Sequence, residues 1–270
     1  MNTIAVEPRV VSRDEWVAAR QALLVREKKL TRARDEVSAL RRELPWLRVE
    51  KPYVFDTLEG PKTLGDLFAG RSQLIVYHFM FGPGWREGCV GCSLLSDHLD
   101  GPLRHLQNRD VAFTAISRAP LAEIEPFRRR MGWKFRWVSS NGTDFNYDFH
   151  VSFTPEQLAS GRVYYNFRDA PTNGTSEEAS GTSVFYRDES GEVFHTYSSY
   201  GRGGEGHLGV YHLLDLTPRG RDEDVRGNLT DWVRHHDRYG AGGTVETTGR
   251  YVAEAQPAAE SPCCKQQSSS

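Results

Sequence analysis

The sequence predicts an α/β fold in which helices flank one mixed β-sheet, and three patterns lead to this prediction. Residues 74–81 form a near-continuous apolar run, LIVYHFMF, which is typical of a strand buried on both faces of a sheet. Stretches of strand and helix character alternate from there to residue 139, which favours parallel strands joined by helices. Residues 182–187 and 192–200 then alternate around a turn at 188–191, as expected for an antiparallel hairpin.

A long helix is predicted ahead of the sheet, over residues 13–44. Ser12 and Glu15 have the spacing of a capping box, and Pro45 ends the helix. One apolar row recurs every seven residues, and a second row is broken by Arg26. The first row is Trp16, Leu23, Leu30, Val37 and Leu44, and the second is Ala19, Ala33 and Leu40. Two interpretations stay open: a helix lying across the domain surface, or the seam of a homodimer.

The remaining elements follow in order. Residues 53–57 are extended and 59–61 form a turn. After the apolar run comes a Gly/Pro-rich loop, then Cys89-Val90-Gly91-Cys92, then leucines at helical spacing up to a break at Gly101-Pro102. Strands are predicted at 111–117 and 135–139, with a helix at 121–131 between them.

The C-terminal half is less regular. Residues 141–180 are rich in Gly, Asn, Ser, Thr and aromatic residues, which indicates an insertion with at most short elements. Helices are predicted at 207–214 and 225–238. Beyond residue 240 the chain is Gly, Thr, Ala, Pro, Gln and Ser with scattered charge, a composition typical of disorder.

Composition restricts the function. The 270 residues carry a formal net charge of -2, so no broad field attracts nucleic acid or an anionic membrane. No stretch approaches the ~20 apolar residues that a membrane helix needs. The N-terminal segment lacks the basic-then-apolar layout of a secretory signal. We therefore expect a cytoplasmic protein without a nucleic-acid or membrane partner.

The four cysteines form two pairs, and the first carries the main functional hypothesis. A Cys-x-x-Cys that follows a buried strand and opens a helix is the arrangement of a thioredoxin-like redox site. Residues 49–240 are therefore expected to form a thioredoxin-like domain with its insertion at 141–180, between an N-terminal helical extension (1–48) and a disordered tail (241–270).

Unpaired backbone N–H groups at the start of a helix stabilise a thiolate and lower the pKa of its thiol. We expect Cys89, nearer the helix end, to be the exposed nucleophile. Cys92, one turn further, should be the buried resolving thiol. Arg86 adds positive charge nearby and Glu87 opposes it.

A metal site is the alternative use of the same two sulfurs. A closed zinc site wants two more Cys or His ligands, and the nearest candidates are His78 and His98. A histidine in a buried strand is more often a hydrogen-bonded core residue. We therefore predict no bound metal and no cofactor.

Four further features each allow a functional and a purely structural interpretation. Trp85, beside the dithiol, either shields it or anchors the packing of its loop. Arg118 ends a predicted strand, where ligand sites of α/β sheets gather, although a surface salt bridge is the simpler interpretation. His235 and His236 are expected to be exposed. Cys263 and Cys264 are expected to be spectator thiols, the alternative being a thiol or metal shuttle.

Several aromatic-rich motifs resemble a bacterial family of unknown function, described as predicted thioredoxin-like dithiol-disulfide oxidoreductases. The motifs are FGPGWREGCVGC, SRAPL, MGWKFRWVSS, DFNYDF, SVFYRDESGEVFHTYSSYGRG, LLDLTPRGRDE and WVRHHDRY, and the resemblance spans roughly residues 10–240. It implies that Cys89 and Cys92 occupy the place of an active dithiol. Thr182 stands where thioredoxins carry a cis-proline that binds substrate backbone and keeps metals off the cysteines. A peroxiredoxin is disfavoured, because its motif needs Thr or Ser three residues before the nucleophile and Arg86 precedes Cys89 there.

Three functional hypotheses follow. The first is a thiol-disulfide oxidoreductase acting on a disulfide- or thiol-containing substrate, either a protein or a small molecule, with Trp85, Arg86, Arg118 and Thr182 as candidate substrate-facing residues. The second is a metal-binding or metal-chaperone protein that uses the same cysteines. The third is a non-catalytic interaction module built on the N-terminal helix.

Overall fold

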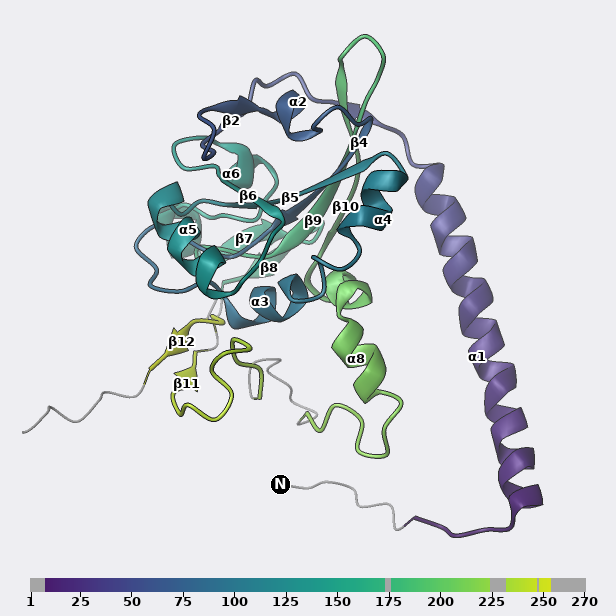
Figure 1. Cartoon of the computed structure of the whole chain (residues 1–270). Coiled ribbons are helices and arrows are strands. Elements are labelled where there is room, and N and C mark those ends of the chain that lie inside the picture. The colour runs from purple at the N-terminus through teal and green to yellow at the C-terminus, as the bar shows by residue number, and fades with distance from the viewer. Residues whose placement is uncertain (1–7, 173–175, 224–231, 247, 254–270) are drawn as a thin grey trace, which may run out of the picture.

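The computed structural model describes residues 8–172, 176–223, 232–246 and 248–253 (Figure 1). Its centre is a six-stranded sheet with the order β1-β10-β9-β4-β5-β6. β4 (Gln73–His78), β5 (Val111–Ser117) and β6 (Arg136–Ser139) are parallel. β9 (Gly181–Arg187) runs antiparallel to β4, and β10 (Val193–Tyr200) antiparallel to β9. The predicted mixed thioredoxin-like sheet is confirmed.

Alternation along β4 divides the core into two layers. Leu74 and Val76 pack on one face with α2 (Leu64–Leu67) and α6 (Phe145–Asp148). Tyr77 and, just beyond the strand, Phe79 pack on the other face with α3 (Val90–Ser96) and α5 (Leu121–Arg130). Side chains of a strand point alternately to opposite faces, so an apolar run is what a strand between two helical layers requires.

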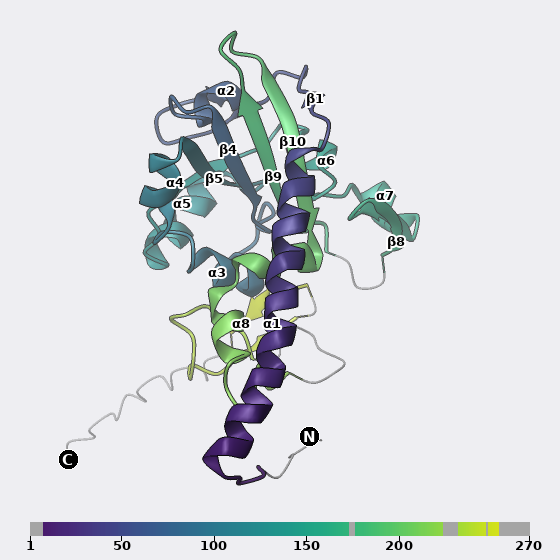
Figure 2. The same cartoon turned by 90° about the vertical axis from the view of Figure 1, so that its right-hand side faces the viewer.

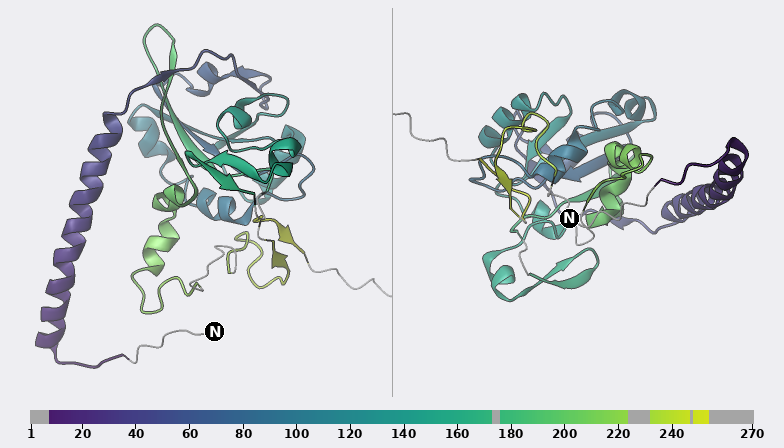
Figure 3. Two further views of the ribbon diagram at one scale, coloured as in Figure 1. Left: turned by 180° about the vertical axis from the view of Figure 1, so that it is seen from behind. Right: turned by 90° about the horizontal axis from the view of Figure 1, so that it is seen from below.

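Shorter elements surround this sheet. β2 (Val54–Phe55) and β3 (Lys62–Thr63) form a small hairpin, and α4 (Leu103–Asn108) packs beside β5. The insertion holds α7 (Pro155–Ala159) and the two-stranded sheet of β7 (Arg162–Tyr165) and β8 (Arg168–Pro171), which project from the domain in Figure 3. After β10 come the 3-10 helix η1 (Gly201–His207) and α8 (Gly209–Leu214).

Helix α1 (Arg13–Arg42) stands beside the domain in Figure 1 and runs in front of it in Figure 2. The Ser12 side chain accepts from the Glu15 backbone, and the Glu15 carboxylate accepts from the Ser12 N–H, which confirms the capping box. None of its residues is buried. The short strand that follows, β1 (Leu47–Arg48), pairs with β10, so the sheet begins before the predicted boundary at residue 49.

Two predictions about the C-terminal region were wrong where the structure describes it. Residues 232–238 contain no helix, and the rest of the segment predicted as helical, 224–231, lies outside the described residues. Within the segment predicted to be disordered, β11 (Thr244–Val245) and β12 (Tyr251–Val252) form a hairpin. Tertiary contacts stabilise it: the Val90 N–H donates to the Gly249 carbonyl at 3.0 Å. Local composition does not report such contacts.

Among the described helices, none combines the length and apolar character needed to cross a membrane.

Buried His78 gives a testable pH dependence. Its Nε2 lies 2.9 Å from Ser183 Oγ, and its ring stacks on Phe145 and Phe149. Burial, reinforced by nearby His195, lowers its pKa from 6.5 to about 3. Between those values the unfolded chain takes up a proton that the folded chain does not, so the free energy of unfolding falls as the pH drops from about 6.5 to about 3.

We expect His78→Gln to flatten this fall by a few kcal/mol, measured by urea unfolding across the same pH range. His105→Gln, at an exposed position in α4, is the control. An unchanged pH slope in the His78 variant would show that His78 does not carry the effect.

Candidate functional site

The two cysteines lie where the loop after β4 enters α3. Cys89 is the N-cap residue, and Cys92 lies in the first turn of the helix. The loop is fixed at its end, because the Cys89 N–H donates to the Met80 carbonyl at 3.0 Å and Ser93 Oγ donates to the Cys89 carbonyl at 2.9 Å. Gly88 is required for this close packing, since a Cβ there would lie 2.5 Å from the Phe79 ring.

The two sulfurs have opposite tendencies to ionise. A hydrogen bond from the Cys92 thiol, helped by the backbone N–H groups of Cys92 and Gly91, lowers the pKa of Cys89 against the opposing effect of burial. Burial, together with the neighbouring Cys89 sulfur, raises the pKa of Cys92 well above its usual range. When the pair loses one proton, the negative charge therefore falls on Cys89 while the other proton stays on Cys92.

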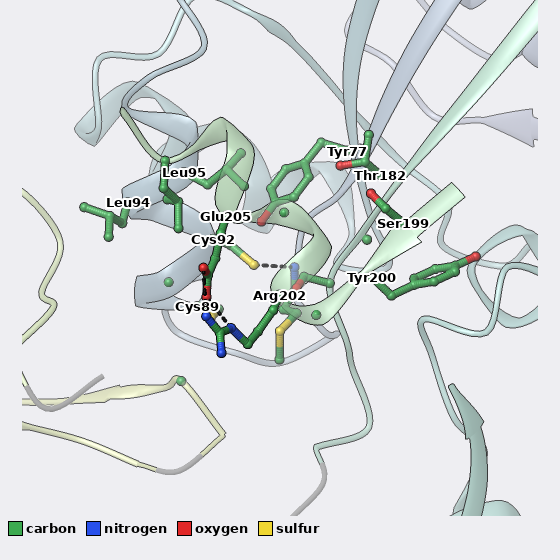
Figure 4. Close-up of a pocket in the computed structure, with 18 of the residues that line it drawn as sticks. Tyr77, Cys89, Cys92, Leu94, Leu95, Thr182, Ser199, Tyr200, Arg202 and Glu205 are labelled. Atoms are coloured by element: carbon green, nitrogen blue, oxygen red, sulfur yellow. Dashed lines mark hydrogen bonds and ion pairs between the residues drawn. The ribbon is translucent and has the colours of Figure 1, made fainter. Parts of the chain in front are cut away.

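A cavity of about 350 Å³ opens beside both sulfurs (Figure 4). Its walls come from the end of β4, from α3, from facing parts of β9 and β10, from the segment 199–211 and from the C-terminal hairpin. In Figure 4 the Tyr77 hydroxyl points toward Cys92. Burial raises the pKa of Tyr77 well above its usual range, and the neighbouring Cys92 adds to the shift, so this hydroxyl stays protonated.

The expectation that Cys89 is exposed was wrong. Its relative exposure is only 6%. Gly249 of the C-terminal hairpin covers it so closely that a Cβ at this position would lie 2.6 Å from Cys89 Sγ. Gly249 also has a φ of +83°, a backbone conformation that favours glycine. The hairpin therefore shields the Cys89 sulfur from bulk solvent.

Contacts among Trp85, Arg250 and Glu177 hold the C-terminal hairpin in place. The Arg250 guanidinium lies 4.0 Å from the centroid of the Trp85 ring, and its Nη2 lies 2.6 Å from Glu177 Oε1. The Trp85 Nε1–H donates to the same carboxylate oxygen at 2.7 Å. Trp85 is thus a packing anchor outside the cavity lining, which is one of the two roles considered for it.

The other candidate residues divide between the cavity and the surface. Thr182 lines the cavity and pairs with Tyr77 across the β4–β9 ladder. Arg86 is exposed and does not line the cavity. Arg118 also lies outside it: its Nε donates to Glu178 Oε1 at 2.6 Å and its Nη1 to the Tyr147 hydroxyl at 2.6 Å. This ion pair is largely buried rather than on the surface, and burial raises the pKa of Glu178 to about 7 despite Arg118.

His235 was expected to be exposed, and it is fully buried. Its Nε2–H donates to the Gly88 carbonyl at 2.9 Å and its Nδ1 lies 3.0 Å from Glu87 Oε2. Burial of the Glu87 carboxyl is outweighed by hydrogen bonds from His235 and Arg130, which lower its pKa to about 2. Glu87 therefore pairs with Arg130 and Arg238 instead of opposing the ionisation of Cys89. His236 is half-exposed, with Nδ1 2.9 Å from Asp97.

The histidines considered as metal ligands are engaged elsewhere. His78 contacts Ser183 in the opposite core layer. His98 donates from Nδ1 to the Leu94 carbonyl at 2.7 Å and accepts the Val210 N–H at Nε2. Within the described ranges, no group of three or more His, Cys, Asp and Glu side chains is arranged to hold a metal ion. Cys263 and Cys264 lie outside the described residues.

Residues 5–239 match the family described as "Bacterial protein of unknown function (DUF899)". The chain belongs to this family. The predicted membership in a bacterial family of unknown function is confirmed; the family description names no activity, so the oxidoreductase activity that the resemblance implies stays a prediction. No curated protein matches the sequence.

Solved structures with similar folds include redox proteins at low identity. Peroxidoxin BcpB from Mycobacterium tuberculosis is 12% identical, with 63% of this chain and 97% of that chain covered and a TM-score of 0.38. Peroxiredoxin Q from Xanthomonas campestris is 11% identical, with 62% and 96% covered and a TM-score of 0.40. A putative protein disulfide isomerase from Bacteroides thetaiotaomicron is 17% identical, with 64% and 92% covered and a TM-score of 0.34. The fold assignment rests on the strand order described above.

Loosening the hairpin should expose Cys89. Arg250→Ala removes an ion pair and a cation–π contact, together worth about 1–2 kcal/mol, so the open population should rise roughly tenfold. We expect a similar rise in the rate at which iodoacetamide alkylates Cys89, followed by mass spectrometry of the labelled peptide.

The matched control is Arg20→Ala, which removes the Arg20–Glu27 ion pair of α1, far from the dithiol in the sequence. Equal alkylation rates in the parent and Arg250→Ala would mean that the Arg250 anchor does not control access to Cys89.

Proposed function

We propose that this protein is a thiol-disulfide oxidoreductase in which Cys89 attacks and Cys92 resolves. The observation that carries the proposal is the placement of Cys89 at the N-cap of α3 and Cys92 in its first turn, both lining one cavity. The opposite shifts of the two thiol pKa values support it. An attacking sulfur must be a thiolate, whereas a resolving thiol can remain protonated until the mixed disulfide has formed.

The reaction balances within the dithiol. The Cys89 thiolate attacks one sulfur of the substrate disulfide, the substrate S–S bond breaks, and the departing sulfur takes up from solvent the proton that Cys89 released on ionising. Cys92 then loses its proton and attacks Cys89, which forms the Cys89–Cys92 disulfide and releases the second substrate thiol. Two electrons and two protons pass to the substrate, and the reverse sequence oxidises a substrate dithiol.

The metal-binding alternative has less support. The two sulfurs offer a soft pair of ligands. Among the described residues that line the cavity, however, none is a histidine, and the one carboxylate, Glu205, is paired with Arg202 at 2.7 Å. The third hypothesis, an interaction module, concerns α1 and is compatible with a redox-active dithiol.

Single substitutions distinguish the two sulfurs. In a Cys263→Ser/Cys264→Ser background, Cys92→Ser should accumulate a mixed disulfide on Cys89, because the resolving step is lost while attack remains. Cys89→Ser should form no adduct and lose disulfide reduction by roughly a hundredfold or more. Intact-protein mass spectrometry and reductase turnover provide the two measurements.

The background variant alone should retain the parental turnover. Retention of activity in Cys89→Ser, together with an ordinary thiol pKa for Cys89 from the pH dependence of alkylation, would refute the proposal. The reduction potential of the couple then gives the direction: about -270 mV suits a reductase and about -120 mV an oxidant.

A further inference from the structure

The wall of the dithiol cavity is predominantly apolar. Side chains from the end of β4, from α3, from the segment 208–211 and from the segment after residue 232 surround the two sulfurs. They are Met80, Leu94, Leu95, Leu208, Tyr211 and Val233. A wall of this kind binds apolar groups and strips water from any charge that enters it.

The cavity holds one pair of opposite charges, and that pair is self-neutralised. Among the residues lining it in the described part of the chain, the only Lys, Arg, Asp or Glu side chains are Arg202 and Glu205. Arg202 Nε lies 2.7 Å from Glu205 Oε1, and the Arg202 side chain is 84% exposed. Figure 4 shows this ion pair at the edge of the dithiol cavity. A substrate carboxylate would find no unpaired cation here.

Neutral polar groups complete the lining on the sheet side. Thr182 of β9 and Ser199 of β10 contribute hydroxyls, which suit an amide or hydroxyl rather than an ion. The volume of about 350 Å³ is at the lower end of small-ligand pockets, which span roughly 300–1,000 Å³. The hairpin over Cys89 further restricts access for a folded protein.

We infer that the substrate of the dithiol is a small, uncharged, apolar disulfide or dithiol. This inference rests on the proposed oxidoreductase function and follows the same balanced exchange: the substrate S–S bond accepts two electrons and two protons, and Cys89 and Cys92 become a disulfide. An anionic disulfide such as glutathione disulfide would lose hydration in the cavity without a compensating ion pair.

Two cyclic disulfides with the same dithiolane ring test the substrate class. Lipoamide is neutral and lipoate carries a carboxylate, so their different reactivity with the protein isolates the effect of charge. We expect the reduced protein to reduce lipoamide at least about tenfold faster than lipoate, after each rate is divided by its rate with free dithiothreitol. Glutathione disulfide and insulin are run in parallel.

A cavity variant sharpens the test. Glu205→Gln frees Arg202 without changing the shape of the side chain, so the lipoamide-to-lipoate ratio should fall several-fold. Glu27→Gln, which breaks an exposed Arg–Glu pair on α1, should leave the ratio unchanged.

The outcomes distinguish an error in the substrate class from an error in the proposed reaction. Equal normalised rates for lipoamide and lipoate, or faster reduction of insulin than of lipoamide, would overturn the substrate class but keep the oxidoreductase. No reaction with any of the four disulfides, although Cys89 is shown to be reduced, would overturn the proposed function itself.

A second inference rests on α1 alone. Its seven-residue row is exposed: Trp16 59%, Leu23 53%, Leu30 54% and Val37 46%. The described contact with the domain lies near the C-terminal end of the helix, where the Arg41 guanidinium is 5.4 Å from the centroid of the Tyr197 ring. Figures 1 and 3 show the rest of the helix standing away from the domain. Helices whose apolar residues recur every seven positions pack against each other along that row and form a left-handed supercoil.

The flanking charges favour a parallel pairing of two copies. With the Trp16 row as position a, a parallel dimer sets each g residue against the e residue five positions later in the other copy. Two of the four such pairs, Glu15 with Arg20 and Glu36 with Arg41, are opposite in charge, and one, Lys29 with Arg34, is repulsive. An antiparallel pairing sets e against e, and three of these four e residues are arginines.

We propose that α1 forms a parallel coiled-coil dimer with a second copy of this chain. Arg26, at a d position in the seam, weakens the dimer. Leu30→Glu should therefore dissociate it, and Arg26→Leu should tighten it by roughly tenfold in dissociation constant. Neither change removes a buried contact, since no residue of α1 is buried.

Analytical ultracentrifugation of the full chain should show twice the 30.6 kDa chain mass. Leu30→Cys should cross-link copy to copy, because equal positions meet in a parallel dimer, whereas the control Lys28→Cys, on the outer face, should not. A parent protein and an Arg26→Leu variant that both remain monomeric at about 100 µM would overturn the proposal, as would cross-linking at both positions alike.

Discussion

Burial of β4 on both faces is the constraint on which the site depends. Because Leu74 and Val76 pack into one layer and Tyr77 into the other, the end of the strand has little freedom to move. The loop that follows must bring Cys89 back to the strand, where its N–H binds the Met80 carbonyl. The Cys89 sulfur therefore sits at a fixed place relative to the sheet, and the cavity is built around that place.

The features of the fold and the site that depend on residues close together in the sequence could be predicted. The apolar run, the hairpin, the capping box at Ser12 and the dithiol at the start of a helix all depend on neighbours within a few positions. Each pattern has a direct physical cause, such as the alternation of a strand or the unpaired amides of a first helical turn.

The contacts between residues far apart in the sequence could not be predicted in this way. His235 binds the carbonyl of Gly88, and Arg250 binds Glu177, across 147 and 73 positions of sequence. In both segments the local composition favours exposed or irregular chain, and a single sequence contains no signal that joins them to the loop before α3. For the same reason Glu87 was assigned a repulsive role, although distant cations neutralise it.

The hairpin over Cys89 links access to ionisation. Burial is the one influence that raises the pKa of Cys89, while every hydrogen bond to its sulfur lowers it. Moving Gly249 away would hydrate the sulfur and remove that opposing influence, but it would leave the bonds from Gly91 and Cys92 in place, because these belong to α3. Opening of the hairpin and ionisation of Cys89 would therefore favour each other, because hydration would lower the pKa of Cys89 further while the hydrogen bonds to its sulfur remain. A substrate that displaces the hairpin with apolar groups would keep water out of the cavity. The Cys89 thiolate would then be stabilised less than in a cavity that has opened to water.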